Sequence, residues 1–250
     1  MNFLQVAPEN GIATITLNRG KVNAINQALV DQLADCLSNL ENDTGVKAVV
    51  LTGRDKFFSF GFDIPEFLNL PPESFATFLA AFTTLYSRLF MFPKPVIAAL
   101  NGHTIAGGCI LATACDYRLM VSGRARISLN EITFGSSLFA GAIDILRFVT
   151  GSRNAEKILY TGAMFSAEDA QQLGLVDQVC PPEQLEPTTR TVAEKYAAHE
   201  GPAFRSMKNL VRRPVVEQMV LKEQDSIQEF LEIWNSDLTW SNLKKIEIRS

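Results

Sequence analysis

Two short apolar runs, each closed by glycine, constrain the fold of this chain more than any other feature. Residues 46–52 read VKAVVLT before Gly53, and residues 95–100 read PVIAAL before Asn101-Gly102. Near-continuous runs of this kind are typical of strands buried on both faces of a parallel sheet. Parallel strands need crossover connections, and the long segment Phe75–Phe92 between the runs predicts one such helix. The chain is therefore expected to have an α/β fold.

The flanking segments extend this pattern in both directions. Residues 2–17 alternate around the turn signal Glu9-Asn10-Gly11, which predicts a β-hairpin, and Asn26 precedes apolar residues at helical spacing. Further short strands are expected at residues 117–121 and 126–129, and helices at residues 140–150, 153–161, 167–173, 185–199 and from 203 onward. Because no long flexible linker separates the halves, one domain is expected. We predict a core over residues 1–190 and a helical cap and oligomerisation region over residues 191–250.

Composition argues against several classes of protein. The 250 residues are 47% hydrophobic with a net charge of −4, so no broad cationic field is available for nucleic acid or anionic membranes. Polar residues interrupt the longest apolar stretch, which makes it a poor membrane span. The first residues resemble no export or import signal, which predicts a cytoplasmic location. The four cysteines have neither paired nor metal-ligand spacing, so neither a disulfide framework nor a metal site is expected.

The sequence lacks several standard catalytic and nucleotide-binding motifs. The sequence contains no Gly-x-Gly-x-x-Gly, Walker or Gly-x-Ser-x-Gly motif, and only two histidines. His103 follows a glycine turn and either faces a site or is a hydrogen-bonded loop residue. His199 is most simply a residue at a helix end.

Three loops after predicted strands carry unusual residues, at the positions where α/β folds place ligands. The first loop, residues 57–64, reads FFSFGFDI, and the second, residues 101–109, reads NGHTIAGGC. Paired glycines that open a helix leave free N–H groups where the helix dipole favours an anion. Gly107 and Gly108 therefore predict an oxyanion site, and the alternative is that they only permit tight packing.

The third loop, residues 128–135, contains the carboxylate of Glu131. Its neighbours Ile127, Leu129, Ile132 and Phe134 are apolar. Burial among them would raise the pKa of the carboxyl and suit it to act as a base near neutral pH. The alternative is a surface glutamate that caps the following segment.

The order of these motifs along the chain is more specific than any one of them. The motifs are Leu17-Asn18-Arg19, Asn23-Ala24, FSFGFDI, NGHTIAGGCILATACDYRLM, the Glu131 segment, Thr161-Gly162 and Gly174-Leu175-Val176-Asp177. In this arrangement the sequence closely resembles the crotonase (enoyl-CoA hydratase/isomerase) superfamily. The resemblance implies a crotonase-like spiral of ββα turns with a helical C-terminal trimerisation region, and hence a homotrimer or hexamer. It also implies an acyl-CoA thioester as substrate, with coenzyme A part of that substrate and no separate cofactor.

The resemblance also implies roles for particular residues. In this family two backbone N–H groups hold the thioester oxygen, and they map onto Phe62 and Gly107. The remaining candidates for binding the CoA moiety or the acyl chain are Lys21, Val22, Ala24, Arg54, Lys56, Phe60, Gly61, Asp63, Ile64, Gly108, Ile110, Phe134 and Leu138, with Phe67 and one face of the predicted helix 75–92 as further lining of the acyl tail.

The family's hydratases carry two catalytic glutamates, and this chain has only the second. The first position is Ile110 and the second is Glu131. One carboxylate suffices to move a proton from C2 to C4 of a 3-enoyl thioester, and the segments around both positions are most similar to the monofunctional Δ3-Δ2-enoyl-CoA isomerases. Two alternatives stay open. One is hydration, decarboxylation or thioester hydrolysis with His103, Asp63 or Asp144 as a second polar group, and the other is a noncatalytic acyl-CoA binder.

Overall fold

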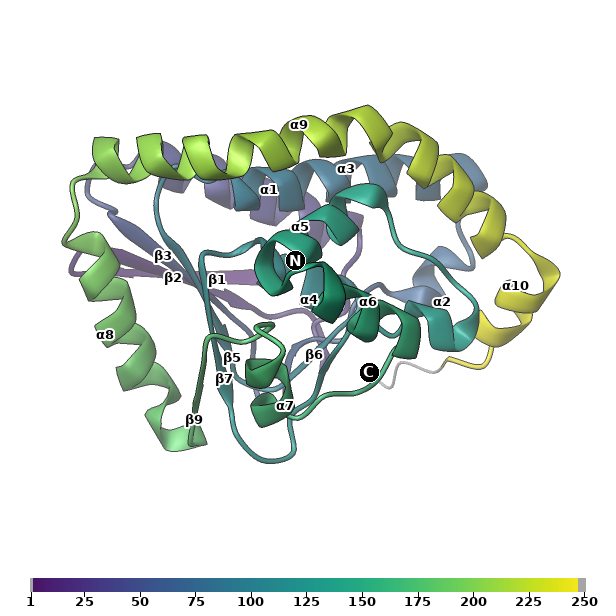
Figure 1. The fold of residues 1–250 in the computed structure, drawn as a ribbon, viewed down its shortest axis with the longest axis horizontal. Coiled ribbons are helices and arrows are strands. Elements are labelled where there is room, and N and C mark those ends of the chain that lie inside the picture. Colours follow the sequence, from purple (N-terminus) through teal and green to yellow (C-terminus); the bar gives the residue numbers. More distant parts are fainter. Residues whose placement is uncertain (1, 247–250) are drawn as a thin grey trace.

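The computed structural model, which describes residues 2–246, contains two sheets with helices packed around them (Figure 1). The larger sheet has six strands in the order β1-β2-β3-β5-β7-β9, and the smaller has three in the order β4-β6-β8. The bounds are β1 Leu4–Glu9, β2 Ile12–Leu17, β3 Ala48–Thr52, β4 Phe57–Ser59, β5 Val96–Leu100, β6 His103–Ile105, β7 Tyr117–Val121, β8 Ile127–Ser128 and β9 Gln178–Cys180.

The strands of the larger sheet follow the sequence pattern. β1 and β2 form the expected antiparallel hairpin, in which Leu4 pairs with Leu17. β3 and β5 are parallel neighbours and pair Val49 with Val96. Every residue of β5 is buried, which explains why its run lacks polar alternation.

The smaller sheet gives the chain its repeating turn. Each of β3, β5 and β7 is followed by a short strand of the second sheet and then by a helix, so the expected spiral of ββα turns is confirmed. Glycines stand where the chain passes between the sheets. A Cβ added at Gly53 would lie 2.2 Å from the Phe57 carbonyl oxygen, and one at Gly102 would lie 2.1 Å from that of Lys56. Only glycine permits these approaches.

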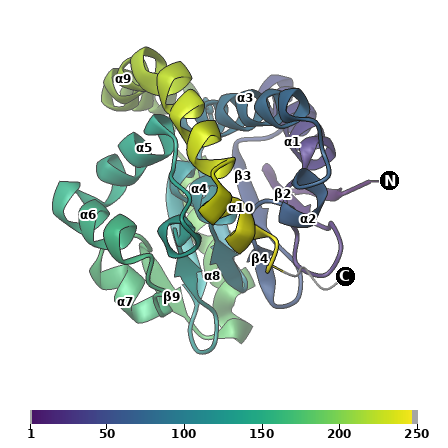
Figure 2. The ribbon, with the colours of Figure 1, turned by 90° about the vertical axis from the view of Figure 1, so that its right-hand side faces the viewer.

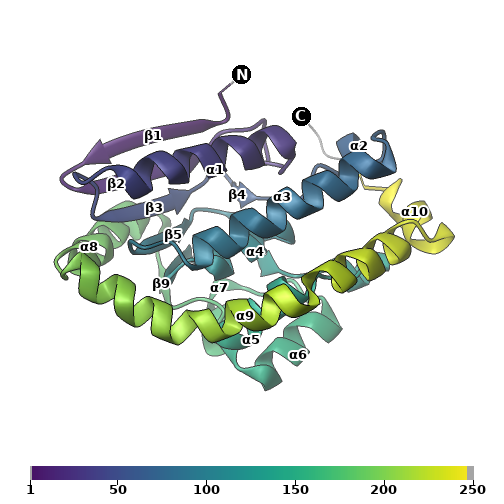
Figure 3. The same cartoon turned by 90° about the horizontal axis from the view of Figure 1, so that it is seen from above.

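The helices cover both faces of the larger sheet. In Figures 1 and 3, α1, α3 and α9 lie on one side, and α8 packs across β3, β5 and β7 on the other. The helix bounds are α1 Gln27–Asn42, α2 Ile64–Phe67, α3 Pro72–Phe90, α4 Gly107–Ala114, α5 Ala140–Thr150, α6 Ser152–Thr161, α7 Ala167–Gln172, α8 Leu185–Ala197, α9 Gly201–Trp234 and α10 Asp237–Leu243, with short 3-10 helices η1 Glu131–Phe134 and η2 Pro182–Gln184.

The C-terminal helix α9 is anchored to the core by buried charges. The Asp116 carboxylate lies 2.8 Å from the Lys208 ammonium and 3.0 Å from the Arg212 guanidinium. Arg212 also donates hydrogen bonds to the carbonyls of Phe90 and Ala114, which end α3 and α4. The cap is therefore fastened to its own core, and the proposed boundary at residue 190 falls inside α8 without a structural break.

None of the helices within residues 2–246 has both the length and the apolar character that crossing a membrane requires. The same residues contain no cluster of three His, Cys, Asp or Glu side chains suited to a metal ion.

Candidate active site

A mostly apolar pocket of about 320 Å³ lies where the three loops meet the C-terminal helices. It brings together eight of the residues predicted from the sequence: Phe60, Phe62, Ile64, Gly107, Ile110, Glu131, Phe134 and Leu138. The sequence reasoning did not assign nine further lining residues to the pocket: Ile105, Ala106, Asn130, Thr133, Ser136, Phe139, Phe230, Trp234 and Ile246.

Glu131 begins η1, which follows β8 after Leu129 and Asn130, and lines this pocket. The residue is only 8% exposed, so the surface-cap alternative is wrong. Burial raises the pKa of its carboxyl to about 8, against a smaller opposing effect of its own backbone N–H. Among the described residues, its Oε2 atom has no hydrogen-bond partner. Ile132 was expected to help bury Glu131, but it is 49% exposed and does not contribute to the burial.

The two predicted oxyanion donors lie on neighbouring loops. The Ile25 N–H donates to the Gly61 carbonyl at 2.7 Å, and the Ile25 carbonyl accepts from the Asp63 N–H at 3.0 Å. Phe62 lies between Gly61 and Asp63, and its backbone N–H donates no hydrogen bond within residues 2–246. The backbone N–H of Gly107, at the start of α4, also donates none within these residues. A Cβ added at Gly61 would lie 3.2 Å from the Gly107 nitrogen, so the loops are in close contact.

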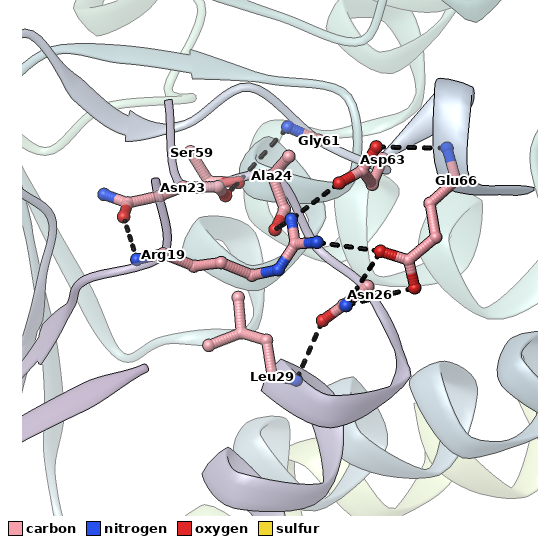
Figure 4. A network of polar contacts seen from close by, with 9 residues as sticks. All are labelled: Arg19, Asn23, Ala24, Asn26, Leu29, Ser59, Gly61, Asp63 and Glu66. Carbon is pink, nitrogen blue, oxygen red and sulfur yellow. Dashed lines mark hydrogen bonds and ion pairs between the residues drawn. The ribbon is translucent and has the colours of Figure 1, made fainter. Parts of the chain in front are cut away.

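A polar network holds the Phe62 loop against the segment that precedes α1 (Figure 4). The Arg19 guanidinium donates to Asp63 Oδ2 at 2.7 Å, to the Ala24 carbonyl at 2.8 Å and to Glu66 Oε2 at 2.8 Å. The Asn26 side chain caps α1 through its oxygen and donates to Glu66 through its nitrogen. Sequence reasoning noted Arg19 only as part of a motif and did not identify this structural role.

Asp63, which was predicted to bind the substrate, lies outside the lining of the pocket. Its carboxylate caps α2 and pairs with Arg19. Gly108, another predicted binding residue, also lies outside the lining, and a Cβ there would lie 2.7 Å from the Ser59 carbonyl oxygen. For Gly108 the tight-packing alternative holds, whereas Gly107 lines the pocket.

The other polar side chains suggested as second catalytic groups also lie outside the lining. The His103 ring packs 5.3 Å from the Phe57 ring. Asp144 pairs with Lys222 at 3.6 Å and with Arg147 at 4.0 Å. The polar neighbours that share the pocket with Glu131 are Asn130, Thr133 and Ser136.

The apolar wall comes from a different helix than expected. None of the α3 residues whose side chains the structure describes is in the pocket lining, and its Phe78 and Phe82 rings pack 4.9 Å behind the Phe62 ring. The lining is completed by Phe230 and Trp234 of α9, which are 2% and 3% exposed. Both residues lie in the region predicted for oligomerisation, but they are buried in their own chain.

The candidates for binding coenzyme A lie beside the pocket, outside its lining. The Val22 carbonyl accepts a hydrogen bond from the Phe60 N–H at 3.0 Å, which places this segment next to a lining residue. Lys21, Arg54 and Lys56 are exposed, and Arg54 donates to Asn18. Contacts of these cations with CoA phosphates stay a prediction.

The fold defines a protein of the crotonase type, and comparison with known proteins agrees. Residues 7–238 match the enoyl-CoA hydratase/isomerase family, so the chain belongs to that family. Enoyl-CoA delta isomerase 1, mitochondrial, of Homo sapiens is 30% identical over 236 residues, which cover 94% of this chain and 78% of that protein. The 2,3-dehydroadipyl-CoA hydratase of Escherichia coli K12 is 35% identical over 215 residues, 85% of this chain and 83% of that protein. The crystal structure of human mitochondrial delta3-delta2-enoyl-CoA isomerase superposes with a TM-score of 0.92 at 30% identity, covering 97% of this chain and 96% of that one.

Proposed function

We propose that this chain is a Δ3-Δ2-enoyl-CoA isomerase, which shifts the double bond of a 3-enoyl-CoA to give the 2-trans-enoyl-CoA. One observation carries the proposal. Glu131 is the one ionisable side chain among the lining residues that the structure describes, and the position on α4 where hydratases carry their other glutamate is the buried Ile110. A site with a single carboxylate suits a reaction in which the same group removes and returns a proton.

The arrangement accounts for each step of that reaction. Glu131 removes a C2 proton, and the negative charge moves onto the thioester oxygen. The free N–H groups of Phe62 and Gly107 stabilise that oxygen, and one such donor is typically worth about 3–4 kcal/mol in the transition state. Protonated Glu131 then delivers the proton to C4, so no water is added.

Isomerisation is separated from the alternatives by the mass of the product. The purified protein should convert 3-hexenoyl-CoA into a conjugated 2-enoyl-CoA of unchanged mass. Formation of a product heavier by one water from 2-hexenoyl-CoA would contradict the proposal and favour hydration. Thermal stabilisation by acyl-CoA without turnover of any enoyl-CoA would favour a noncatalytic binder.

The pH dependence of the reaction should report Glu131. Because burial raises the pKa of its carboxyl to about 8, Glu131 is protonated in most enzyme molecules at pH 6 and cannot act as a base in them. We expect kcat/KM to rise by about tenfold per pH unit up to about pH 8 and then to level off. Initial rates between about pH 5.5 and pH 9.5 measure this, with preincubation at each pH as the control for stability. A profile that is flat across this range would contradict the role of Glu131.

Trp234 should limit the length of the acyl chain. The lining residues differ in their exposure to solvent. Phe60 is 36% exposed and lies at the mouth of the pocket. Phe139, Phe230 and Trp234 are at most 3% exposed, so these aromatic residues form its inner end. At roughly 30 Å³ for a group the size of water, its volume of about 320 Å³ holds roughly ten carbon-sized groups, which fits short and medium chains.

Trp234→Ala is expected to raise the ratio of kcat/KM for dodecenoyl-CoA over hexenoyl-CoA by about tenfold or more, since one methylene in an apolar pocket is typically worth that factor. Trp240→Ala is the matched control, because Trp240 lies on α10 outside the pocket lining and should leave the ratio unchanged. An unchanged ratio in Trp234→Ala would place the end of the acyl site elsewhere.

The assembly and location of the protein stay predictions. Copies are expected to form a homotrimer or hexamer, and several apolar side chains of α9 are exposed and available for such contacts: Met207, Leu210, Val211, Val220 and Leu221. A cytoplasmic location is likewise untested, and the human relative is a mitochondrial protein.

A further inference from the structure

One of the two carboxylate oxygens of Glu131 is not fixed by a hydrogen bond within the described residues. Among residues 2–246, no donor bonds its Oε2 atom, and Asn130 Oδ1 beside it is also without a partner. A base that must reach two carbons needs a fixed position, since a misplacement of about 1 Å can cost about 10²-fold in rate. The direction of the Glu131 carboxylate therefore depends on the backbone of η1.

Within η1, the backbone makes only local turns. The Thr133 N–H donates to the Asn130 carbonyl at 2.9 Å, and the Ser136 N–H donates to the Glu131 carbonyl at 3.0 Å. Gly135 ends the turn in the left-handed region, with φ +84°. A single 3-10 turn of this length is intrinsically weak. Its position relative to the rest of the pocket needs contacts from other elements.

Helix α10 makes hydrogen bonds to the C-terminal end of η1. Thr239 Oγ1 donates to the Gly135 carbonyl at 2.7 Å, and Asn242 Nδ2 donates to the Phe134 carbonyl at 3.3 Å. Thr239 is 1% exposed, and its own N–H is capped by the Ser236 side chain. Figure 2 shows α10 in yellow on the face turned to the viewer.

We propose that Thr239 is a positioning residue for Glu131, assisted by Asn242. The hydroxyl of Thr239 fixes the end of η1, and this fixes the direction in which the first residue of that turn presents its carboxylate. The arrangement makes the C-terminal helix part of the catalytic geometry, in addition to the lining that Trp234 and Ile246 supply on either side of α10. The inference rests on the proposed function, because it requires Glu131 to act as the base.

The test uses a pair of variants at position 239. Thr239→Val keeps the shape and removes the donor, so we expect kcat for 3-hexenoyl-CoA to fall by about 10- to 100-fold while KM changes by less than about threefold. Thr239→Ser retains the hydroxyl and should recover most of kcat. The matched control is Thr150→Val, because the buried hydroxyl of Thr150 donates to the Leu146 carbonyl within α5, away from the pocket. This control should keep the wild-type kcat.

The results separate this inference from the proposed function. A kcat in Thr239→Val within about twofold of wild type, or an equal loss in Thr239→Ser, overturns the positioning role. If Thr239→Val does not fold, Asn242→Ala decides, with an expected loss of about three- to tenfold in kcat, and an unchanged kcat overturns the proposal. Glu131→Gln is measured alongside. If Glu131→Gln is inactive and Thr239→Val has the wild-type kcat, only the positioning role of Thr239 is overturned. If Glu131→Gln is fully active, the positioning role and the proposed function are both overturned.

Discussion

Replacing Glu131 by glutamine is expected to lower kcat for 3-enoyl-CoA by about 10²- to 10⁴-fold, the usual loss when a general base is removed. Glutamine has nearly the same shape and fills the same space in the pocket, but its amide cannot accept the C2 proton. Initial rates with 3-hexenoyl-CoA at about pH 8.5, where the wild-type carboxyl is mostly ionised, give the largest difference. Retention of the full rate would rule out the assigned role.

The thermal stability of the same variant provides an independent check. Because burial raises the pKa of Glu131 above its ordinary value, the folded state binds the proton more tightly than the unfolded chain. The wild type therefore loses stability as the pH rises from the ordinary glutamate pKa to about 8, and Glu131→Gln does not. We expect the melting temperature of the variant to rise relative to that of the wild type as the pH increases across this window. A constant difference between the two would contradict the raised pKa.

Gly61→Ala is expected to lower kcat by about 10²-fold, the typical cost of losing one oxyanion donor. Gly61 has φ +91°, and a Cβ there would lie 2.9 Å from the Ala106 Cβ and 3.2 Å from the Gly107 nitrogen. The added methyl group therefore pushes apart the two loops whose N–H groups are proposed to bind one thioester oxygen. Steady-state rates with 3-hexenoyl-CoA measure the effect.

Gly123→Ala is the matched control for the backbone. Gly123 has φ +99°, and a Cβ there would meet nothing within 4 Å. Alanine at either position bears a similar conformational cost, on the order of 1 kcal/mol of stability. Gly123→Ala should lose that stability and keep its kcat. Equal losses of kcat in both variants would show that the close approach of Gly61 to α4 has no part in catalysis.

The larger sheet was predictable from the sequence because its central strands are long enough to show a pattern. β3 and β5 each have five residues, and their apolar runs end at residues that turn the chain. In the smaller sheet the residue pattern predicted only β8, within the strand expected at residues 126–129, and it missed β4 and β6, which have three residues each. Two or three residues show no periodicity, and their pairing joins segments that lie far apart in the sequence.

The candidate site divides in the same way. The burial of Glu131 was predictable because most of its neighbours in the sequence are apolar. The free N–H of Gly107 was predictable because this residue begins a helix. The inner end of the pocket was not, because the pattern of α9 indicates that Phe230 and Trp234 are apolar but not what they pack against. Asp63 was assigned to the substrate since it follows the Phe62 loop, and its partner Arg19 is 44 residues away. Long-range pairing of this kind leaves no signal in a single sequence.

Glu131 is proposed to carry one proton from C2 to C4, and an isotope label tests this transfer most directly. The substrate is 3-hexenoyl-CoA with deuterium at C2, and the product is analysed for the position of the label. Since Glu131 is only 8% exposed, the deuteron it removes should exchange slowly with water, and deuterium is predicted at C4 of the 2-hexenoyl-CoA product. Loss of all the removed deuterium to solvent, with only hydrogen delivered to C4, would contradict transfer by a single buried carboxylate.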